Sequence, residues 1–136
     1  LLQIFIFTSI CCAIIRKIDE ALKFSSVVFS LPIPTYVTPS PFFHTVGVDI
    51  DRLKVSKKEF AEAIAAEGIW VNPDYKYVVS EWDWIKKYLK TNTYTPNATA
   101  FRGRTFNILF NERFLDEDIH DIFEGILKVE SVFAKC

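Results

Sequence analysis

The residues of this 136-residue chain best suited to chemistry are a histidine in a strand-like run and a tyrosine-rich loop. His44 lies among alternating apolar and small residues, a pattern typical of a strand. An imidazole at such a position either exchanges a proton with a ligand or makes a hydrogen bond in a half-buried site. The second histidine, His120, falls in the first turn of an expected helix, where a solvated side chain is the simpler expectation.

The loop after a short apolar segment offers contacts for a substrate. Asp74, Tyr75 and Lys76 follow Pro73, and loops at strand ends are where binding residues gather. Tyrosine rings at such a place can equally cover the core from outside. Arg102 and the residues after it, Gly-Arg, could hold a phosphate or a carboxylate, but they fit a plain turn as well.

Other chemical signatures are weak in this sequence. The acidic run at residues 116–118 is explained by the favourable field at a helix start and does not require a metal. The sequence contains no phosphate-binding loop, glycine-rich dinucleotide turn, pair of metal ligands at helical spacing or nucleophile elbow. The residues alone therefore give no signal for a catalytic or metal-binding residue.

The composition narrows the class of protein. Lys and Arg total 16 and Asp and Glu total 17, a net charge of −1, which excludes a strongly basic nucleic-acid binder. Three cysteines, two of them adjacent, exclude a disulfide framework, and Cys11 and Cys12 are interpreted as small buried hydrophobic residues. With 50% hydrophobic and 24% charged residues, the chain is expected to form one packed α/β or α+β domain.

The first fifteen residues are almost entirely apolar, and three interpretations stay open. As a helix they would span about 22 Å, short of the roughly 30 Å of a bilayer core. They can be a core or interface segment, as helix or strand, a remnant of a membrane span or signal sequence, or a translation artefact. Because the chain begins with Leu1 and contains no Met, we expect a processed chain or a fragment.

Periodicity and turn residues predict the elements that must position these side chains. The strongest local signal is a capping box from Ser56 to Glu59, followed by an apolar stripe and a helix end at Gly68. A proline-rich connector covers residues 25–40. Helices are expected over residues 16–24, 57–67, 80–88 and 116–133, strands over 42–50, 69–71 and 105–110, a short strand over 27–29, and a polar loop over 91–99.

This order predicts an α+β fold with a small antiparallel or mixed sheet of about three strands and helices on one face. We expect residues 1–41 to form an apolar N-terminal segment, a helix and the connector. Residues 42–136 would form the small domain.

The ordered motifs from about residue 16 onward resemble the C-terminal part of the DegT/DnrJ/EryC1/StrS family of pyridoxal-phosphate-dependent sugar aminotransferases, which have the aspartate aminotransferase fold. That family's small domain shows an aromatic-His strand, a Ser-opened helix ending in Gly-Ile, a His-Tyr pair and an acidic helix start. The matching segments here are residues 43–46, 56–60, 68–69, 74–75, 104–110 and 115–119.

Several positions depart from the family pattern. Asp74 replaces the usual His, and Val79 stands where a second His often helps to bind the sugar nucleotide. Ile108-Leu109 replaces Leu-Pro, and the Trp-rich residues 81–84 are unlike common members. The resemblance therefore implies an amino acceptor that differs from a typical nucleotide sugar.

The resemblance implies what a complete protein would do. The cofactor would be pyridoxal phosphate bound to a lysine of a large domain upstream, so this chain alone would bind no cofactor and be inactive. The substrates would be an amino acid donor and a keto sugar or nucleotide sugar, and the protein a cytoplasmic homodimer that binds no nucleic acid. This chain would contribute substrate contacts from His44, Asp74, Tyr75 and Lys76.

Two alternatives remain. One is a small non-enzymatic interaction domain, tethered to a membrane through residues 1–15. The other is a pyridoxal-phosphate-dependent sugar dehydratase of the same fold, which uses a His in place of the reactive Lys.

Overall fold

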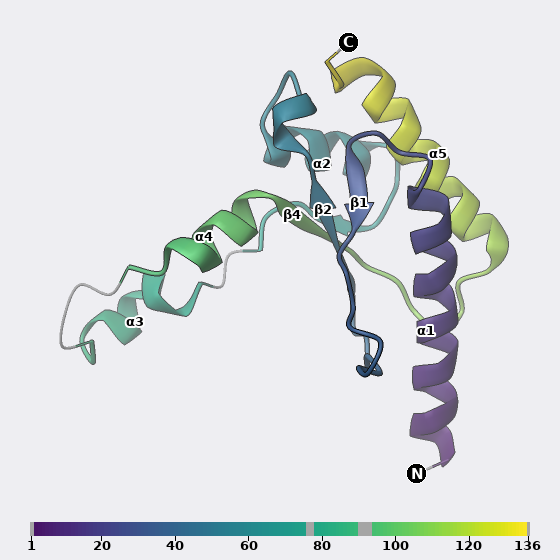
Figure 1. Cartoon of the computed structure of the whole chain (residues 1–136), viewed down its shortest axis with the longest axis horizontal. Coiled ribbons are helices and arrows are strands. Elements are labelled where there is room, and N and C mark those ends of the chain that lie inside the picture. Colours follow the sequence, from purple (N-terminus) through teal and green to yellow (C-terminus); the bar gives the residue numbers. More distant parts are fainter. Residues whose placement is uncertain (1, 76–77, 90–93, 136) are drawn as a thin grey trace.

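The computed structural model describes residues 2–75, 78–89 and 94–135, and the part described is an α+β fold with a four-stranded antiparallel sheet. This confirms the expected fold class (Figure 1). Its elements in chain order are α1 (Leu2–Leu22), β1 (Val28–Ser30), β2 (His44–Val48), the 3₁₀ turn η1 (Ile50–Arg52), α2 (Lys57–Ala66), β3 (Val71–Asn72), the 3₁₀ turn η2 (Val79–Glu81), α3 (Asp83–Lys86), α4 (Pro96–Gly103), β4 (Thr105–Ile108) and α5 (Asp116–Phe133).

The sheet has the order β1-β2-β4-β3, so the two longest strands lie at its centre. All four expected strands are present, with β1 at one edge of the sheet and β2 and β4 shorter than expected. The strand expected over residues 69–71 instead covers Val71–Asn72, and Trp70 is 62% exposed. In the central pair Thr45 lies opposite Asn107 and Val46 lies opposite Phe106. Because successive side chains of a strand point to opposite faces, this register determines what each face of the sheet displays.

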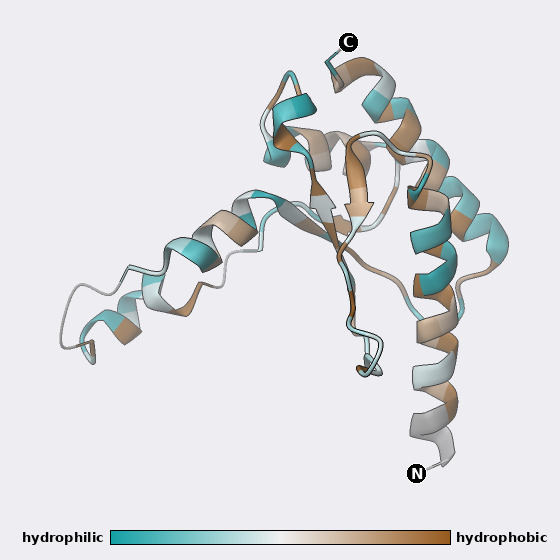
Figure 2. Ribbon diagram, viewed as in Figure 1, coloured by the Kyte–Doolittle hydropathy of each residue, from teal (hydrophilic) through white to brown (hydrophobic). Residues whose placement is uncertain are grey.

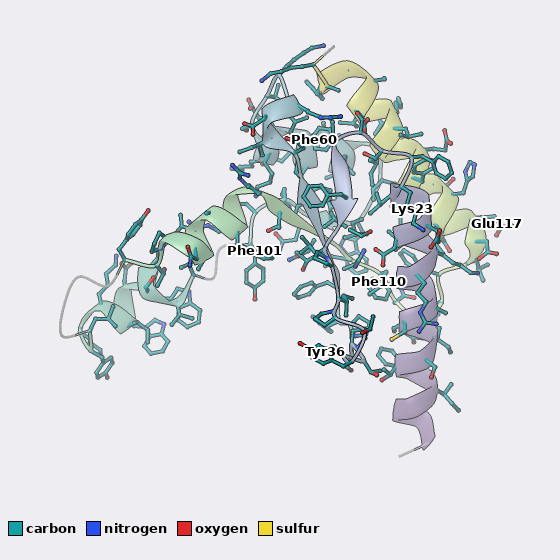
Figure 3. All side chains as sticks on the ribbon, viewed as in Figure 1. Lys23, Tyr36, Phe60, Phe101, Phe110 and Glu117 are labelled. Atoms are coloured by element: carbon teal, nitrogen blue, oxygen red, sulfur yellow. The ribbon has the colours of Figure 1, made fainter. Side chains whose placement is uncertain are left out.

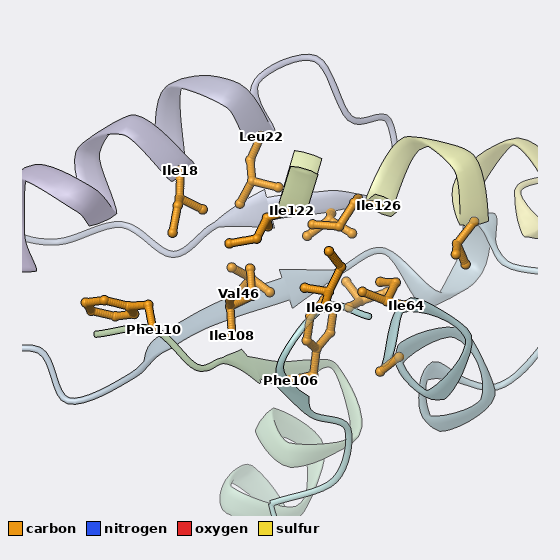
Figure 4. Packing of buried hydrophobic residues seen from close by; sticks show 14 of the residues in the cluster. Ile18, Leu22, Val46, Ile64, Ile69, Phe106, Ile108, Phe110, Ile122 and Ile126 are labelled. Atoms are coloured by element: carbon orange, nitrogen blue, oxygen red, sulfur yellow. The ribbon is translucent and has the colours of Figure 1, made fainter. Parts of the chain in front are cut away.

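One face of the sheet is covered by helices and forms the core. Val46 and Phe106 are at most 1% exposed, and they pack against side chains of α1, α2 and α5 (Figure 4). In α5 the buried residues recur every three or four positions, as the sequence predicted, and hydrophobic and hydrophilic stretches alternate along this helix in Figure 2. The expected helix at residues 116–133 is confirmed at both ends.

The apolar N-terminal run is a helix that continues without a break to Leu22. Cys11, Ile14 and Ile15 are buried in the common core, which confirms the core interpretation for this part of the run. The two cysteines are unpaired, and burial is the main cause that raises the pKa of the Cys11 thiol. None of the described helices is long and apolar enough to cross a membrane.

The capping box and the glycine stop of α2 are both present. The Ser56 hydroxyl accepts from the Glu59 N–H at 3.2 Å, and the Glu59 carboxylate accepts from the Ser56 N–H at 2.9 Å. Gly68 has a φ of +90°, which side-chain-bearing residues rarely adopt. It turns the chain so that Ile69, 9% exposed, folds back onto the core.

Residues 79–103 differ from the sequence expectation. The helix expected over residues 80–88 is divided into the 3₁₀ turn η2 and the single turn of α3. The expected loop contains helix α4, whose first residue is Pro96; proline suits this position because the first helical N–H has no intrahelical partner. Together α3 and α4 form an arm that projects from the sheet (Figure 1).

The buried carboxylate of Glu130 on α5 joins the first part of the chain to the last. It accepts hydrogen bonds from the Ser25 hydroxyl at 2.5 Å and from the Ser26 hydroxyl and N–H at 2.6 and 2.9 Å. Residues on both sides of residue 41 thus contribute to one core. The domain boundary expected there, which remains a prediction, falls in the connector between β1 and β2.

Truncation of Phe60 tests the position of this core. Its side chain on α2 is fully buried, so Phe60→Ala should lower the free energy of unfolding by about 3–5 kcal/mol. Val132→Ala is the matched control, because Val132 is 60% exposed and its loss should change stability by less than about 0.5 kcal/mol. Denaturant titration of both variants gives the comparison; equal losses would contradict this packing.

Candidate functional site

A pocket of about 500 Å³ lies on the sheet face opposite the helices. This volume is within the range of small-molecule binding sites. Three parts of the chain form its walls: the outward-facing residues of β2 and β4, the segment from Tyr75 to η2, and α4 with the residue before it. The lining residues are Phe43, Thr45, Tyr75, Val78, Val79, Ser80, Thr95, Ala98, Phe101, Arg102, Thr105 and Asn107.

The strand register explains why the sheet supplies polar residues here and apolar ones to the core. Thr45 and Asn107 are cross-strand partners on the pocket face, and the Thr45 hydroxyl donates to the Asn107 side-chain oxygen at 2.9 Å. Helix α4 adds Phe101 where the arm joins the sheet (Figure 3). The Thr105 hydroxyl donates to the Phe101 carbonyl oxygen at 2.9 Å, which fixes the end of α4 against β4.

Among the described lining residues, Arg102 supplies the single charged side chain. Its guanidinium donates two hydrogen bonds to the Glu81 carboxylate, at 2.7 and 3.0 Å. This pairing lowers the pKa of Glu81 and raises the pKa of Arg102. The sequence allows the Arg-Gly-Arg segment to be either an anion site or a turn. In the structure Arg102 is held by Glu81, while Arg104 is exposed and lines a second hollow beside β1 and β2.

The loop that carries Tyr75 is fixed from below by a buried lysine. The Lys57 ammonium donates to the Pro73 carbonyl oxygen at 2.7 Å and to the Asp74 carboxylate at 3.1 Å. The Tyr75 ring then stands beside Phe43, with ring centroids 6.1 Å apart. Of the predicted substrate contacts, Tyr75 therefore lines the pocket and Asp74 holds its loop, whereas Lys76 lies outside the described residues.

His44 points to the other face of the sheet. Its ring is 6% exposed, and Nε2 lies 2.8 Å from Oδ1 of Asp19 on α1. The Ser30 hydroxyl donates to the same oxygen at 2.5 Å. The structure thus joins His44 to α1 and not to Tyr75. His120 is exposed, 3.9 Å from Glu124, in agreement with the expected solvated side chain.

Several pocket residues were missed when the sequence was interpreted. Phe43 and Thr45 could have been found, because strand alternation places both on the face opposite His44. Ala98 was missed because residues 91–99 fit a polar loop, and Phe101 because no element was expected between that loop and the strand at residues 105–110. The proline at the start of α4 was the available signal.

The described residues do not fit a pyridoxal phosphate site of their own. No described lysine lines either of these two pockets, and the ammonium of the buried Lys57 donates to Pro73 and Asp74. A cofactor that needs a reactive amine thus has no suitable partner in the part of the chain described. In the same part there is no group of three or more His, Cys, Asp or Glu residues able to hold a metal ion.

Comparison with solved structures gives consistent matches to sugar aminotransferases. The aminotransferase TlmJ from Streptoalloteichus hindustanus matches 96% of this chain with a TM-score of 0.76 and 15% identity. Helicobacter pylori PseC, an aminotransferase of pseudoaminic acid biosynthesis, matches 94% with a TM-score of 0.74 and 13% identity. A DegT DnrJ EryC1 StrS aminotransferase from Brucella abortus matches 90% with a TM-score of 0.70 and 17% identity.

These matches identify the fold as a domain-sized part of sugar aminotransferase structures. The chain covers 33%, 34% and 31% of those three proteins, about a third of their length. No protein-family model and no curated protein sequence matches it.

The contact between Asp19 and His44 should make the free energy of unfolding depend on pH in the acidic range. Burial raises the pKa of Asp19, but hydrogen bonds from His44 and Ser30 and the charges of His44 and Lys23 outweigh it, so the pKa lies below its ordinary value of 3.8. A carboxyl group with a lowered folded pKa stabilises the fold above the unfolded pKa and loses this effect as pH falls through the folded pKa. Unfolding free energy measured from pH 7 to pH 2 should therefore decline below about pH 4.

Asp19→Asn should lower stability at pH 7 by about 1–3 kcal/mol and flatten this acid decline. Asp121→Asn, at an exposed position of α5, is the control that should change neither. An Asp19→Asn variant with the wild-type acid profile would contradict the role of this contact.

Removal of the Lys57 ammonium should loosen the pocket loop. Lys57→Met keeps the apolar stem but leaves Pro73 and Asp74 without their donor, so unfolding free energy should fall by about 1–3 kcal/mol. The neighbouring exposed residue gives the control: Lys58→Met loses only a 3.7 Å pair with Glu62, worth less than about 0.5 kcal/mol. Indistinguishable melting curves for the two variants would refute this assignment.

Proposed function

We propose that this chain is the small-domain part of a pyridoxal-phosphate-dependent aminotransferase that transfers an amino group from an amino acid to a keto sugar. The observation that carries the proposal is the match of 96% of the chain to about a third of the aminotransferase TlmJ, with a TM-score of 0.76. A fold alone does not fix an activity. The ordered motifs of the sequence give the second, independent support.

Within this proposal the chain forms one wall of the substrate site and holds no reactive group. Tyr75 lines the pocket beside Phe43, where its hydroxyl can hydrogen-bond a sugar and its ring can help to orient it. We assign Lys76, the next residue, to an anionic group of the substrate. Asp74 supports the loop through Lys57, and His44 supports β2 from behind through Asp19.

The cofactor would be held by a part of the protein other than the residues described. Pyridoxal phosphate would supply the electron sink for the proton shift between donor and acceptor. This chain's own contribution would be to orient the acceptor and to exclude water from it. By the same resemblance we propose glutamate as an amino donor, a homodimeric assembly and a cytoplasmic location.

The proposal is tested on the protein encoded by the complete reading frame that contains these residues. A lysine-bound cofactor gives an absorption band near the visible edge, which borohydride removes, and incubation with glutamate and a keto sugar should yield 2-oxoglutarate and an amino sugar. The 136-residue chain incubated with pyridoxal phosphate is the comparison and should show no such stable band. A complete protein without the band or the amine transfer would refute the proposal.

The substrate contacts are tested by two substitutions in that complete protein. Tyr75→Phe and Lys76→Ala should each raise KM for the keto sugar by about tenfold, the loss expected for one hydrogen bond to a charged or polar group, while the cofactor band remains. Tyr36→Phe is the matched control, since Tyr36 is 88% exposed on the connector. Unchanged kinetics in both test variants would remove these two residues from the site.

A further inference from the structure

We propose that the pocket over β2 and β4 binds an uncharged aromatic or apolar group and discriminates against phosphates and carboxylates. The pocket and its preference are properties of this chain alone. That the group belongs to the amino acceptor, as its non-sugar part, rests on the proposed function. The anionic group assigned there to Lys76 would then be a separate part of the substrate that stays outside this pocket.

The charge of the pocket is already balanced within the protein. Among the described lining residues Arg102 carries the charge, and its guanidinium donates two hydrogen bonds to the Glu81 carboxylate. The negative charge of Asp74 acts on the same guanidinium from the side of the loop. A phosphate that enters would therefore lose its hydration and meet a cation whose charge is already neutralised, which is unfavourable.

Four hydroxyl groups of the walls are also hydrogen-bonded within the protein. The Ser80 and Thr95 hydroxyls hydrogen-bond each other at 2.8 Å, and the Thr45 hydroxyl donates to Asn107 at 2.9 Å. The Thr105 hydroxyl donates to a backbone carbonyl at 2.9 Å. A polar ligand would have to replace these bonds, whereas an apolar ligand leaves them intact and removes apolar wall from water.

The apolar walls suit a flat ring. Phe43 and Tyr75 meet at an interplanar angle of 46°, so their faces form a wedge. Phe101 and Ala98 on α4 and Val78 before η2 line the other sides. Aromatic groups gain both buried area and favourable ring contacts in such surroundings. A volume of about 500 Å³ admits a bicyclic ring system with room for a substituent.

A matched pair of probes tests the preference directly on the 136-residue chain. We expect 2-naphthol to bind and 2-naphthyl phosphate to bind at least about tenfold more weakly, because the described lining residues offer a phosphate no unpaired cation. Fluorescence titration of each probe gives the two dissociation constants. Equal affinities, or tighter binding of the phosphate, would overturn the proposal.

Removal of the Glu81 carboxylate should free Arg102 and shift the preference of the pocket toward the phosphate probe. Glu81 is exposed, so Glu81→Ala should fold normally, and the freed guanidinium should strengthen binding of 2-naphthyl phosphate by about tenfold or more while 2-naphthol binds as before. Glu124→Ala, on the distant surface of α5, is the control and should change neither. If Glu81→Ala leaves the phosphate affinity unchanged, the charge-balance argument is wrong.

A second variant shows whether the probe occupies this pocket. Ala98→Trp should fill it from α4 and weaken 2-naphthol binding at least about tenfold, whereas Val132→Trp on the exposed side of α5 should not. Undiminished binding in Ala98→Trp would overturn the assignment of the site. A second outcome would also overturn it: if the wild-type chain is a dimer and Ala98→Trp is a monomer, the pocket is an interface between copies of the chain. None of these outcomes depends on transamination, so they are separable from the cofactor test.

Discussion

The antiparallel pairing of β2 with β4 is the constraint on which the rest of the structure depends. Its register places Val46 and Phe106 toward the helices and Thr45 and Asn107 toward the pocket. A shift of one residue would exchange the two sets, because side chains alternate with a period of two. The core side is held by the burial of large apolar groups, and the pocket side by the Thr45–Asn107 hydrogen bond. Core and candidate site are therefore two sides of the same pairing.

Three charged groups that are buried or half-buried connect distant segments to this sheet. Glu130 holds the turn before β1, Asp19 joins α1 to His44, and Lys57 fixes the loop before Tyr75. Each is hydrogen-bonded in a confined place, where a missing partner is costly. Of the three, Lys57 acts on the pocket, because it fixes the loop that carries Tyr75.

The sequence was sufficient for those elements whose local signals agreed with the tertiary structure. The Ser56 capping box, the stop at Gly68 and the apolar stripe of residues 116–133 each have a local physical cause, and each was confirmed. The conformations of the N-terminal run and of α4 were harder to predict, because their local signals do not decide between two structures. An apolar run suits a helix and a buried strand alike, and the segment around Pro96 has the composition of a loop. In both cases packing against the rest of the chain decides the conformation.

The site was less predictable than the fold. His44 drew attention through its chemistry, yet it serves Asp19 behind the sheet, and the pocket is built largely from apolar residues with no catalytic signature. The pairing of Arg102 with Glu81 joins positions 21 residues apart and could not be inferred from spacing.

The most direct measurement is an NMR experiment on the 136-residue chain with 2-naphthol, recording nuclear Overhauser contacts between the ring and assigned side chains. The account predicts contacts to Phe43, Tyr75 and Phe101 and none to Val46 or Phe106. Contacts to Val46 and Phe106 instead would show that the faces of the sheet are exchanged and would contradict the account.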